Sequence, residues 1–89
     1  MELVVVERVY EQPLTDELVE ALKRRAGPCF ELRRITHLKM LRSKDGLRSI
    51  CLYEAPDAAT VREALEQVGS PYARVWSVEG TYDGDKPST

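Results

Sequence analysis

The amino-acid sequence predicts an α+β domain of the ferredoxin-like type, in which the elements follow the order β-α-β-β-α-β. The first observation is a hairpin signal, because residues 35–55 read as two strands joined by a tight turn at Asp45 and Gly46. Glycine tolerates a positive φ in such a turn, and aspartate caps its own turn. The second observation is that two stretches with helical spacing separate this hairpin from a strand on either side. Together they predict a four-stranded antiparallel sheet with two helices on one face.

The chain opens with a strand and continues into a helix. Residues 2–10 alternate and are rich in valine, which is typical of a strand, and Pro13 follows its end. Thr15 is a suitable N-cap for the first helix. Asp16 and Glu17 lie in the first turn of that helix, where the helix dipole favours negative charge.

One face of this first helix carries most of its apolar residues. The residues on this face are Leu18, Val19, Leu22, Ala26, Cys29, Phe30 and Arg33. Gly27 and Pro28 interrupt the helix, because proline has no N–H and clashes with the carbonyl four residues earlier. The apolar positions keep their phase across the break, so we predict either one kinked helix or two stacked segments, ending near Arg33.

The remaining elements complete the predicted order. Pro56 ends the third strand, Asp57 is a suitable N-cap for the second helix, and Gly69 suits the position just after it. The predicted ranges are 35–42 and 47–55 for the second and third strands, 58–68 for the second helix and 73–82 for the fourth strand. We expect a single domain over residues 1–82 and a loose polar tail over residues 83–89.

The composition is that of one ordinary globular domain, with 89 residues and a net charge of −2. No apolar run approaches the roughly 20 residues of a membrane span, and the N-terminus lacks the pattern of a signal peptide. Cys29 and Cys51 are too few for a disulfide framework. We therefore expect a cytoplasmic protein with free thiols and no membrane partner. The sequence has no Gly-rich phosphate loop and no nucleophile elbow, which disfavours nucleotide enzymes and hydrolases.

Charge is distributed unevenly along the chain. The segment from Lys23 to Arg48 holds nine basic and two acidic residues. This indicates either a solvated basic face or a docking patch for an acidic partner or an anionic ligand. We expect no nucleic-acid partner, because the chain as a whole is acidic and the predicted open face of the central strands offers only Tyr53 for base stacking.

Strand alternation divides the sheet residues between a helix-covered face and an open face. We expect the more apolar set on the helix side: Val4, Val6, Leu38, Met40, Ile50, Leu52, Trp76 and Val78. We expect a mixed set on the open face: Leu3, Val5, Glu7, Ile35, His37, Lys39, Leu41, Ser49, Cys51, Tyr53, Val75, Ser77 and Glu79. Five of the second set are aliphatic and would expose a contiguous apolar patch, so we predict a homodimer in which two sheets pack face to face.

Five residues of the predicted open face carry groups suited to ligand binding: Glu7, His37, Cys51, Tyr53 and Glu79. Between two facing sheets they would line a partly dry cleft, which is the usual setting of a small-molecule site. We therefore predict a homodimeric binding protein that holds a small ligand or a transition metal between its sheets. The alternative is a cofactor-independent enzyme of the monooxygenase, isomerase or cyclase type in the same cleft, and whether the protein is an enzyme stays open.

Four motifs carry a resemblance to a known family. They are Val6-Glu7-Arg8, the turn Asp45-Gly46, the run Cys51-Leu52-Tyr53-Glu54-Ala55-Pro56-Asp57 and the helical segment Val61-Arg62-Glu63-Ala64. With them the chain resembles a family of small, uncharacterised bacterial proteins with a dimeric ferredoxin-like fold, some of which are described as nickel-binding. The resemblance covers nearly the whole chain except the tail. It implies a dimeric α+β barrel and, at most, the binding of a metal such as nickel or of a small molecule.

His37 and Glu7 are the candidate metal ligands. His37 is the only histidine, whereas a nickel or zinc site normally uses several nitrogen or sulfur donors. A site built from His37, Glu7 and Cys51 would therefore need a contribution from a second subunit. The alternative is a histidine packed at the dimer seam. Cys51 is either a reactive thiol or a buried structural cysteine, and Tyr53 is either a general acid or an interface aromatic.

Overall fold

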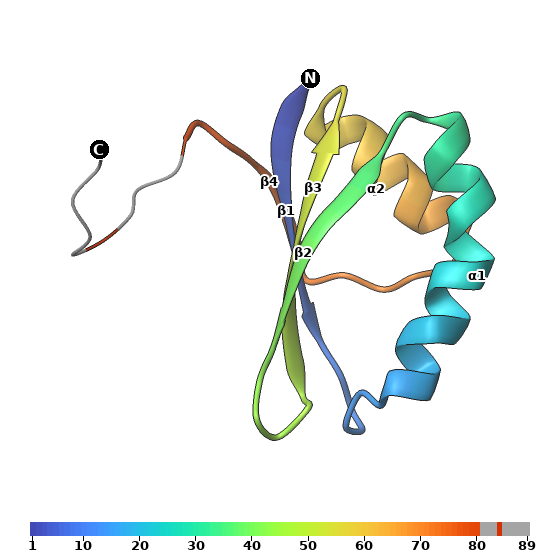
Figure 1. Cartoon of the computed structure of the whole chain (residues 1–89), viewed down its shortest axis with the longest axis vertical. Coiled ribbons are helices and arrows are strands. Elements are labelled where there is room, and N and C mark those ends of the chain that lie inside the picture. The colour runs from blue at the N-terminus through green and yellow to red at the C-terminus, as the bar shows by residue number, and fades with distance from the viewer. Residues whose placement is uncertain (81–83, 85–89) are drawn as a thin grey trace.

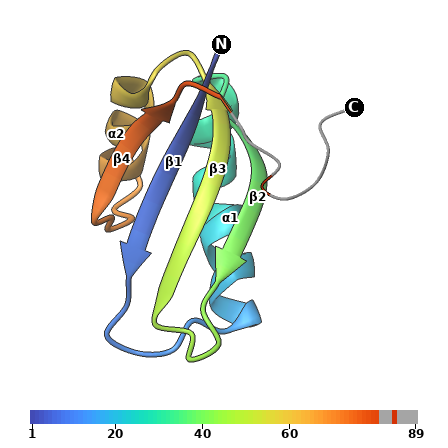
Figure 2. The same cartoon turned by 90° about the vertical axis from the view of Figure 1, so that its left-hand side faces the viewer.

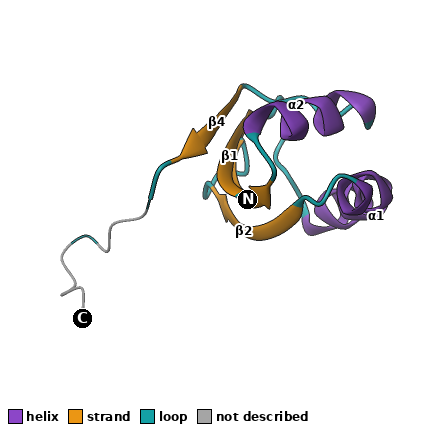
Figure 3. Ribbon diagram, turned by 90° about the horizontal axis from the view of Figure 1, so that it is seen from above, coloured by secondary structure: helices purple, strands orange, loops and turns teal. Residues whose placement is uncertain are grey.

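The computed structural model of the chain describes residues 1–80 and residue 84, and it has the predicted α+β element order (Figure 1). The elements are β1 (Glu2–Val9), α1 (Asp16–Leu32), β2 (Thr36–Arg42), β3 (Arg48–Ala55), α2 (Ala58–Gln67) and β4 (Arg74–Val78). The strands form one antiparallel sheet in the order β2-β3-β1-β4, so β1 and β3 are central as expected. Both helices cover the same face of the sheet, and the ribbon leaves the other face uncovered (Figures 1 and 3).

Both predicted helix starts are confirmed. The Thr15 hydroxyl accepts a hydrogen bond from the Leu18 N–H at 3.2 Å, and an Asp57 carboxylate oxygen accepts one from the Thr60 N–H at 2.7 Å. Each bond satisfies a backbone donor that has no partner within the helix. Pro28 lies inside α1, which continues through it, so the chain forms one helix and not two stacked segments.

The strand limits differ slightly from the predicted ranges. β4 ends at Val78, four residues before the predicted end, and the last two residues of the predicted strand lie outside the described residues. The prediction of a loose tail over residues 83–89 also lies outside the described residues, except for Gly84. None of the helices in the described part of the chain is both long and apolar enough to cross a membrane.

The core lies between the sheet and α2. Val61, Ala64 and Leu65 of α2 have no exposed surface, and they pack with the inner faces of β1, β3 and β4. The sheet residues in this cluster are Val4, Val6, Cys51, Tyr53, Ala55 and Val75, and Ile35 joins it from the loop before β2. α1 contributes no fully buried residue. The two helices therefore pack against the sheet very differently.

The predicted face assignment is wrong for β3 and β4. Val4 pairs with Tyr53 and Val6 with Cys51, so Cys51 and Tyr53 face the helices together with the correctly placed residues of β1. Val75 pairs with Val6 and also lies on the helix side. The expectation that the more apolar set faces the helices fails because both faces of this sheet are apolar at the centre. Alternation shows which residues share a face, but not which face is covered.

In β2 the expected alternation is interrupted. His37 pairs with Tyr53, whereas Met40 pairs with Cys51, and the register shifts between His37 and Lys39. This irregularity has the form of a β-bulge, which inserts an extra residue and reverses the facing of those beyond it. His37 and Met40 therefore both face the helices, although they are three positions apart, and the prediction that His37 lies on the open face is wrong.

Figure 2 looks onto the open face of the sheet, with both helices behind it. The strand pairings place a broad apolar surface on this face. Its residues are Leu3, Val5, Leu41, Ile50, Leu52, Trp76 and Val78, of which Val5 is buried beneath its neighbours. Trp76 is 46% exposed and Leu41 is 61% exposed. The prediction of an apolar open face is therefore confirmed, although Ile35 and Val75, which were assigned to it, are buried on the helix side.

Gly46 is the residue of the β2–β3 turn that tolerates no side chain. Its φ is +74°, and a Cβ added there would lie 3.0 Å from the Pro13 Cβ and 3.1 Å from the Leu14 nitrogen. Gly69 has a similar φ of +68°, but a Cβ there meets nothing within 4 Å. Comparing substitutions at the two glycines therefore separates the cost of backbone strain from the cost of steric overlap.

We predict that Gly46→Ala lowers the free energy of unfolding by roughly 2–4 kcal/mol, because the left-handed backbone and the overlap with Pro13 both oppose it. Gly69→Ala is the matched control and should cost about 1–2 kcal/mol from the backbone alone. Urea denaturation of the three proteins measures both values. Equal losses for the two variants would show that the turn does not pack against the segment before α1.

Candidate functional site

A cavity of about 560 Å³ lies between α1 and the inner face of the sheet. One wall is the apolar face of α1, represented by Val19, Leu22 and Ala26. The opposite wall comes from β1, β2 and β3 and includes Met40 and Tyr53. The volume lies within the usual range of small-molecule sites.

α1 makes one contact with the strands near each of its ends. Near its C-terminal end, the Phe30 ring packs edge-on against the Tyr53 ring at a centroid distance of 5.5 Å. At its N-terminal end, the Arg42 Nη2 donates to the Asp16 carboxylate at 2.8 Å. Between these two contacts the apolar residues of α1 are at best half-buried. The middle of the helix therefore stands over a space and does not pack into the core.

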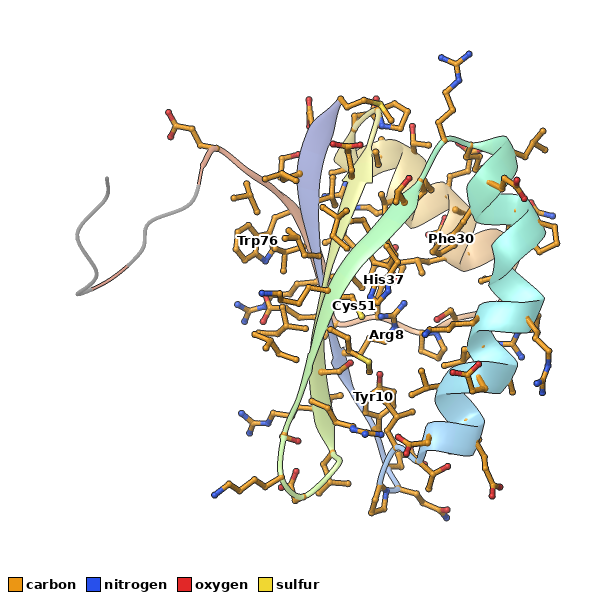
Figure 4. All side chains as sticks on the ribbon, viewed as in Figure 1. Arg8, Tyr10, Phe30, His37, Cys51 and Trp76 are labelled. Atoms are coloured by element: carbon orange, nitrogen blue, oxygen red, sulfur yellow. The ribbon has the colours of Figure 1, made fainter. Side chains whose placement is uncertain are left out.

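Arg8 lies at the floor of this cavity (Figure 4). It follows Val4 and Val6 on the inner face of β1, and only 8% of its surface is exposed. Its Nη1 donates to the Cys51 Sγ at 3.4 Å, and its Nη2 donates to the Ser70 Oγ at 3.5 Å. The Nε is buried and has no hydrogen-bond partner among the described residues. The hydrogen-bond donors of the guanidinium therefore have only weak partners or none among the described residues.

Arg8 also lacks a counter-ion within the described residues, where the ion pairs involve only Lys23, Arg33 and Arg42 as cations. Burial acts to lower the pKa of Arg8, but Tyr53, Cys51 and Tyr10 outweigh it and the net shift of the pKa is upward. The guanidinium is therefore charged at all physiological pH values. A buried charge without an opposite charge is costly, and such a charge in a cavity makes that cavity a candidate binding site.

The Tyr53 side chain beside Arg8 is neutral. Burial raises the pKa of Tyr53 to about 12, although the charge of Arg8 acts in the opposite direction. The Tyr10 hydroxyl lies 2.7 Å from the Ser49 Oγ and shares a hydrogen bond with it. The cavity thus combines apolar walls, one buried positive charge from Arg8 and hydroxyl groups.

His37 lies at the β2 side of the cavity, where its ring is 5.1 Å from the Tyr53 ring. Burial lowers the pKa of His37, and the positive charges of Lys23 and Arg8 lower it further, although a hydrogen bond with the Lys39 backbone raises it in part. The imidazole is therefore held in its neutral form more strongly than a free histidine.

The five predicted site residues separate into two groups. His37, Cys51 and Tyr53 line the cavity together, but on the helix side of the sheet and not between two sheets. Glu7 lies on the open face, where its carboxylate accepts a hydrogen bond from the Trp76 Nε1 at 2.8 Å. Glu79 follows β4 and is exposed. The five side chains therefore do not converge within one chain.

Arg8, Tyr10 and Ser70 were missed as candidates from the sequence. Arg8 was detectable, because a charged residue in phase with Val4 and Val6 on a central strand lies on a buried face. Ser70 was not detectable, since it reaches the cavity from the loop after α2.

A nickel ion does not fit the described residues of a single chain. No group of three or more His, Cys, Asp or Glu side chains suited to a metal occurs within residues 1–80 and 84. Glu7 and His37, the two candidate ligands, lie on opposite faces of the sheet. Arg8 donates to Cys51, so the thiol lies beside a fixed positive charge that repels cations.

Comparisons with known proteins relate the chain to one family. Residues 4–78 match the family model described as "Nickel responsive protein SCO4226-like". The chain is also similar to the crystal structure of SCO4226 from Streptomyces coelicolor A3(2), with a TM-score of 0.78 and 12% sequence identity. That match covers 90% of this chain and 99% of the other, and it supports the fold alone. No curated protein matches the sequence.

The lowered pKa of His37 predicts a specific loss of stability in mild acid. The unfolded chain takes up the histidine proton near the ordinary pKa of about 6.5, whereas the folded protein does so only at lower pH. As pH falls through this window, the unfolded state binds more protons and the free energy of unfolding decreases.

We predict that His37→Gln removes this part of the pH dependence. Urea denaturation at a series of pH values below 7 should show the stability of the wild type falling relative to that of the variant. Comparison with the variant cancels the contribution of carboxyl groups that titrate at lower pH. Parallel curves would contradict the lowered pKa of His37 in the folded protein.

Proposed function

The chain belongs to the SCO4226-like family of nickel-responsive proteins, and from that premise we propose that it is a homodimeric binding protein whose small-molecule ligand lies between α1 and the sheet. The observation that carries this proposal is the cavity under the apolar face of α1, whose residues include no fully buried side chain. An amphipathic helix normally buries this face against a core. A ligand with an apolar body would supply the missing contact.

This proposal differs in location from the site expected between two facing sheets. His37, Cys51 and Tyr53 are available to a ligand on the helix side, where they line one cavity. The enzyme alternative relied on the same residues in a cleft between sheets, together with Glu7. Since Glu7 faces away from that cavity, the geometry favours binding over that alternative.

The nickel response in the family's description does not require a metal held by one subunit of this chain. The donors among the described residues of one chain do not form a nickel site, and Glu7 and His37 lie on opposite faces of the sheet. We propose that any stoichiometric nickel site in this protein uses donors from more than one chain, and that the cavity under α1 takes an organic ligand.

The homodimer part of the proposal rests on the open sheet face. At ~25 cal/mol per Å², covering several hundred Å² of its apolar surface contributes several kcal/mol, which is substantial for a domain of this size. Charges of both signs lie on the same face, including Glu7, Arg74 and Lys39. In a two-fold interface the same surface meets itself, so acidic groups of one subunit can pair with basic groups of the other.

Filling the cavity tests the ligand site. We predict that Ala26→Trp abolishes binding of octanol, a neutral apolar probe, because the indole occupies the space under α1. Ala21→Trp is the matched control, since Ala21 is exposed on the same helix and does not line the cavity. Isothermal titration calorimetry measures both. Loss of binding in neither variant, or in both, would contradict the location of the site.

Charging the open face tests the dimer. We predict that the wild type sediments as a dimer at micromolar concentration and that Trp76→Arg sediments as a monomer with its fold retained, as judged by circular dichroism. Leu32→Arg is the matched control, because Leu32 is an even more exposed apolar residue at the end of α1. A wild type that sediments as a monomer would contradict the dimer and leave the ligand site untouched.

A further inference from the structure

We infer that the cavity under α1 binds a monoanion with an apolar body, of the class of monocarboxylic acids with an aliphatic tail, and that Arg8 holds the carboxylate. This inference rests on the proposed function, because it names the ligand class of the same cavity. It adds a charge requirement that the apolar cavity alone does not impose.

The first argument is the unused hydrogen-bonding capacity of Arg8. A guanidinium has five N–H donors arranged to match a carboxylate. Of the five, one donates to the Cys51 sulfur at 3.4 Å, which is a weak acceptor, and one to the Ser70 hydroxyl at 3.5 Å, which is a long contact. The buried Nε has no partner among the described residues. A bound carboxylate would supply the strong acceptors that Arg8 lacks.

The second argument is the charge of the surrounding surface. Lys23 and Arg34 line the cavity together with Arg8, and Glu31 is the one carboxylate that does so. Glu31 is exposed, and no ion pair joins it to Arg8. His37 and Tyr53 are neutral, so the described residues around the cavity carry a net positive charge. Such a site attracts and retains anions.

The third argument is the number of buried charges in the cavity and their position. The buried end of the cavity offers one guanidinium, and the remaining walls are largely apolar. Lys23 and Arg34 also line the cavity but are exposed, so Arg8 is the cation that meets a ligand away from solvent, and one negative charge is matched there. Leu22, Ala26 and Met40 offer surface for an aliphatic tail. A monocarboxylate with an apolar tail can pair with Arg8 through its carboxylate and pack against the apolar walls through its tail.

The test compares octanoate with octanol, which share a tail and differ in the charged head. We predict that wild-type protein binds octanoate at least about tenfold more tightly than octanol, since hydrogen bonds to charged groups are the strong ones. Arg8→Met should bind the two compounds equally and should also unfold at a higher urea concentration when empty, because it removes an unpaired buried charge. Isothermal titration calorimetry and urea denaturation give these values.

Arg24→Met is the matched control for charge. Arg24 is exposed on α1, does not line the cavity, and its replacement changes the net charge by the same amount. This variant should retain the preference for octanoate. If it loses the preference as Arg8→Met does, then general electrostatic attraction and not Arg8 holds the ligand, and the inference is overturned.

A measurement on the wild type covers the case in which Arg8→Met fails to fold. The NMR signal of the Arg8 Nε–H should shift on addition of octanoate and stay unchanged with octanol. Equal binding of both compounds to wild type, with no shift of this signal, overturns the charge requirement while the proposed ligand site stands. Binding of neither compound overturns both the inference and the site.

Discussion

Arg8 lies beneath α1 because side chains alternate between the two faces of β1. It shares the inner face of this strand with Val4 and Val6, which have no exposed surface. This strand is central, so its inner face cannot be turned toward solvent without losing the core under α2. The guanidinium must therefore lie under the helices. If α1 lay closer to the sheet, it would bury the unpaired guanidinium further, at a cost in free energy. The space between α1 and the sheet avoids that cost.

The two helices cover different parts of the inner face of the sheet: α2 covers the packed core, and α1 covers the cavity. α2 packs closely through small and branched residues, with Val61, Ala64 and Leu65 fully buried. α1 is anchored by Phe30 against Tyr53 and by the ion pair of Asp16 with Arg42, and it spans the cavity between these points.

The sequence was sufficient for the order of elements, for both helix N-caps and for the facing of β1. It was insufficient for the facing of β3 and β4, because both faces of the sheet offer apolar residues. The helix side receives the smaller set, such as Ala55 and Val75, whereas Ile50 and Trp76 lie on the open face. The irregularity in β2 leaves no clear mark in the sequence, and it decides that His37 faces the cavity. Of the residues proposed for the site from the sequence, His37, Cys51 and Tyr53 do meet, but with Arg8 and not with Glu7.

The most direct test of this account is a crystal structure of the protein grown with octanoate. The account predicts electron density for the carboxylate within hydrogen-bonding distance of the Arg8 guanidinium and for the tail against the apolar face of α1. A structure in which Leu22 and Ala26 pack directly onto the sheet, with no space above Arg8, would contradict it.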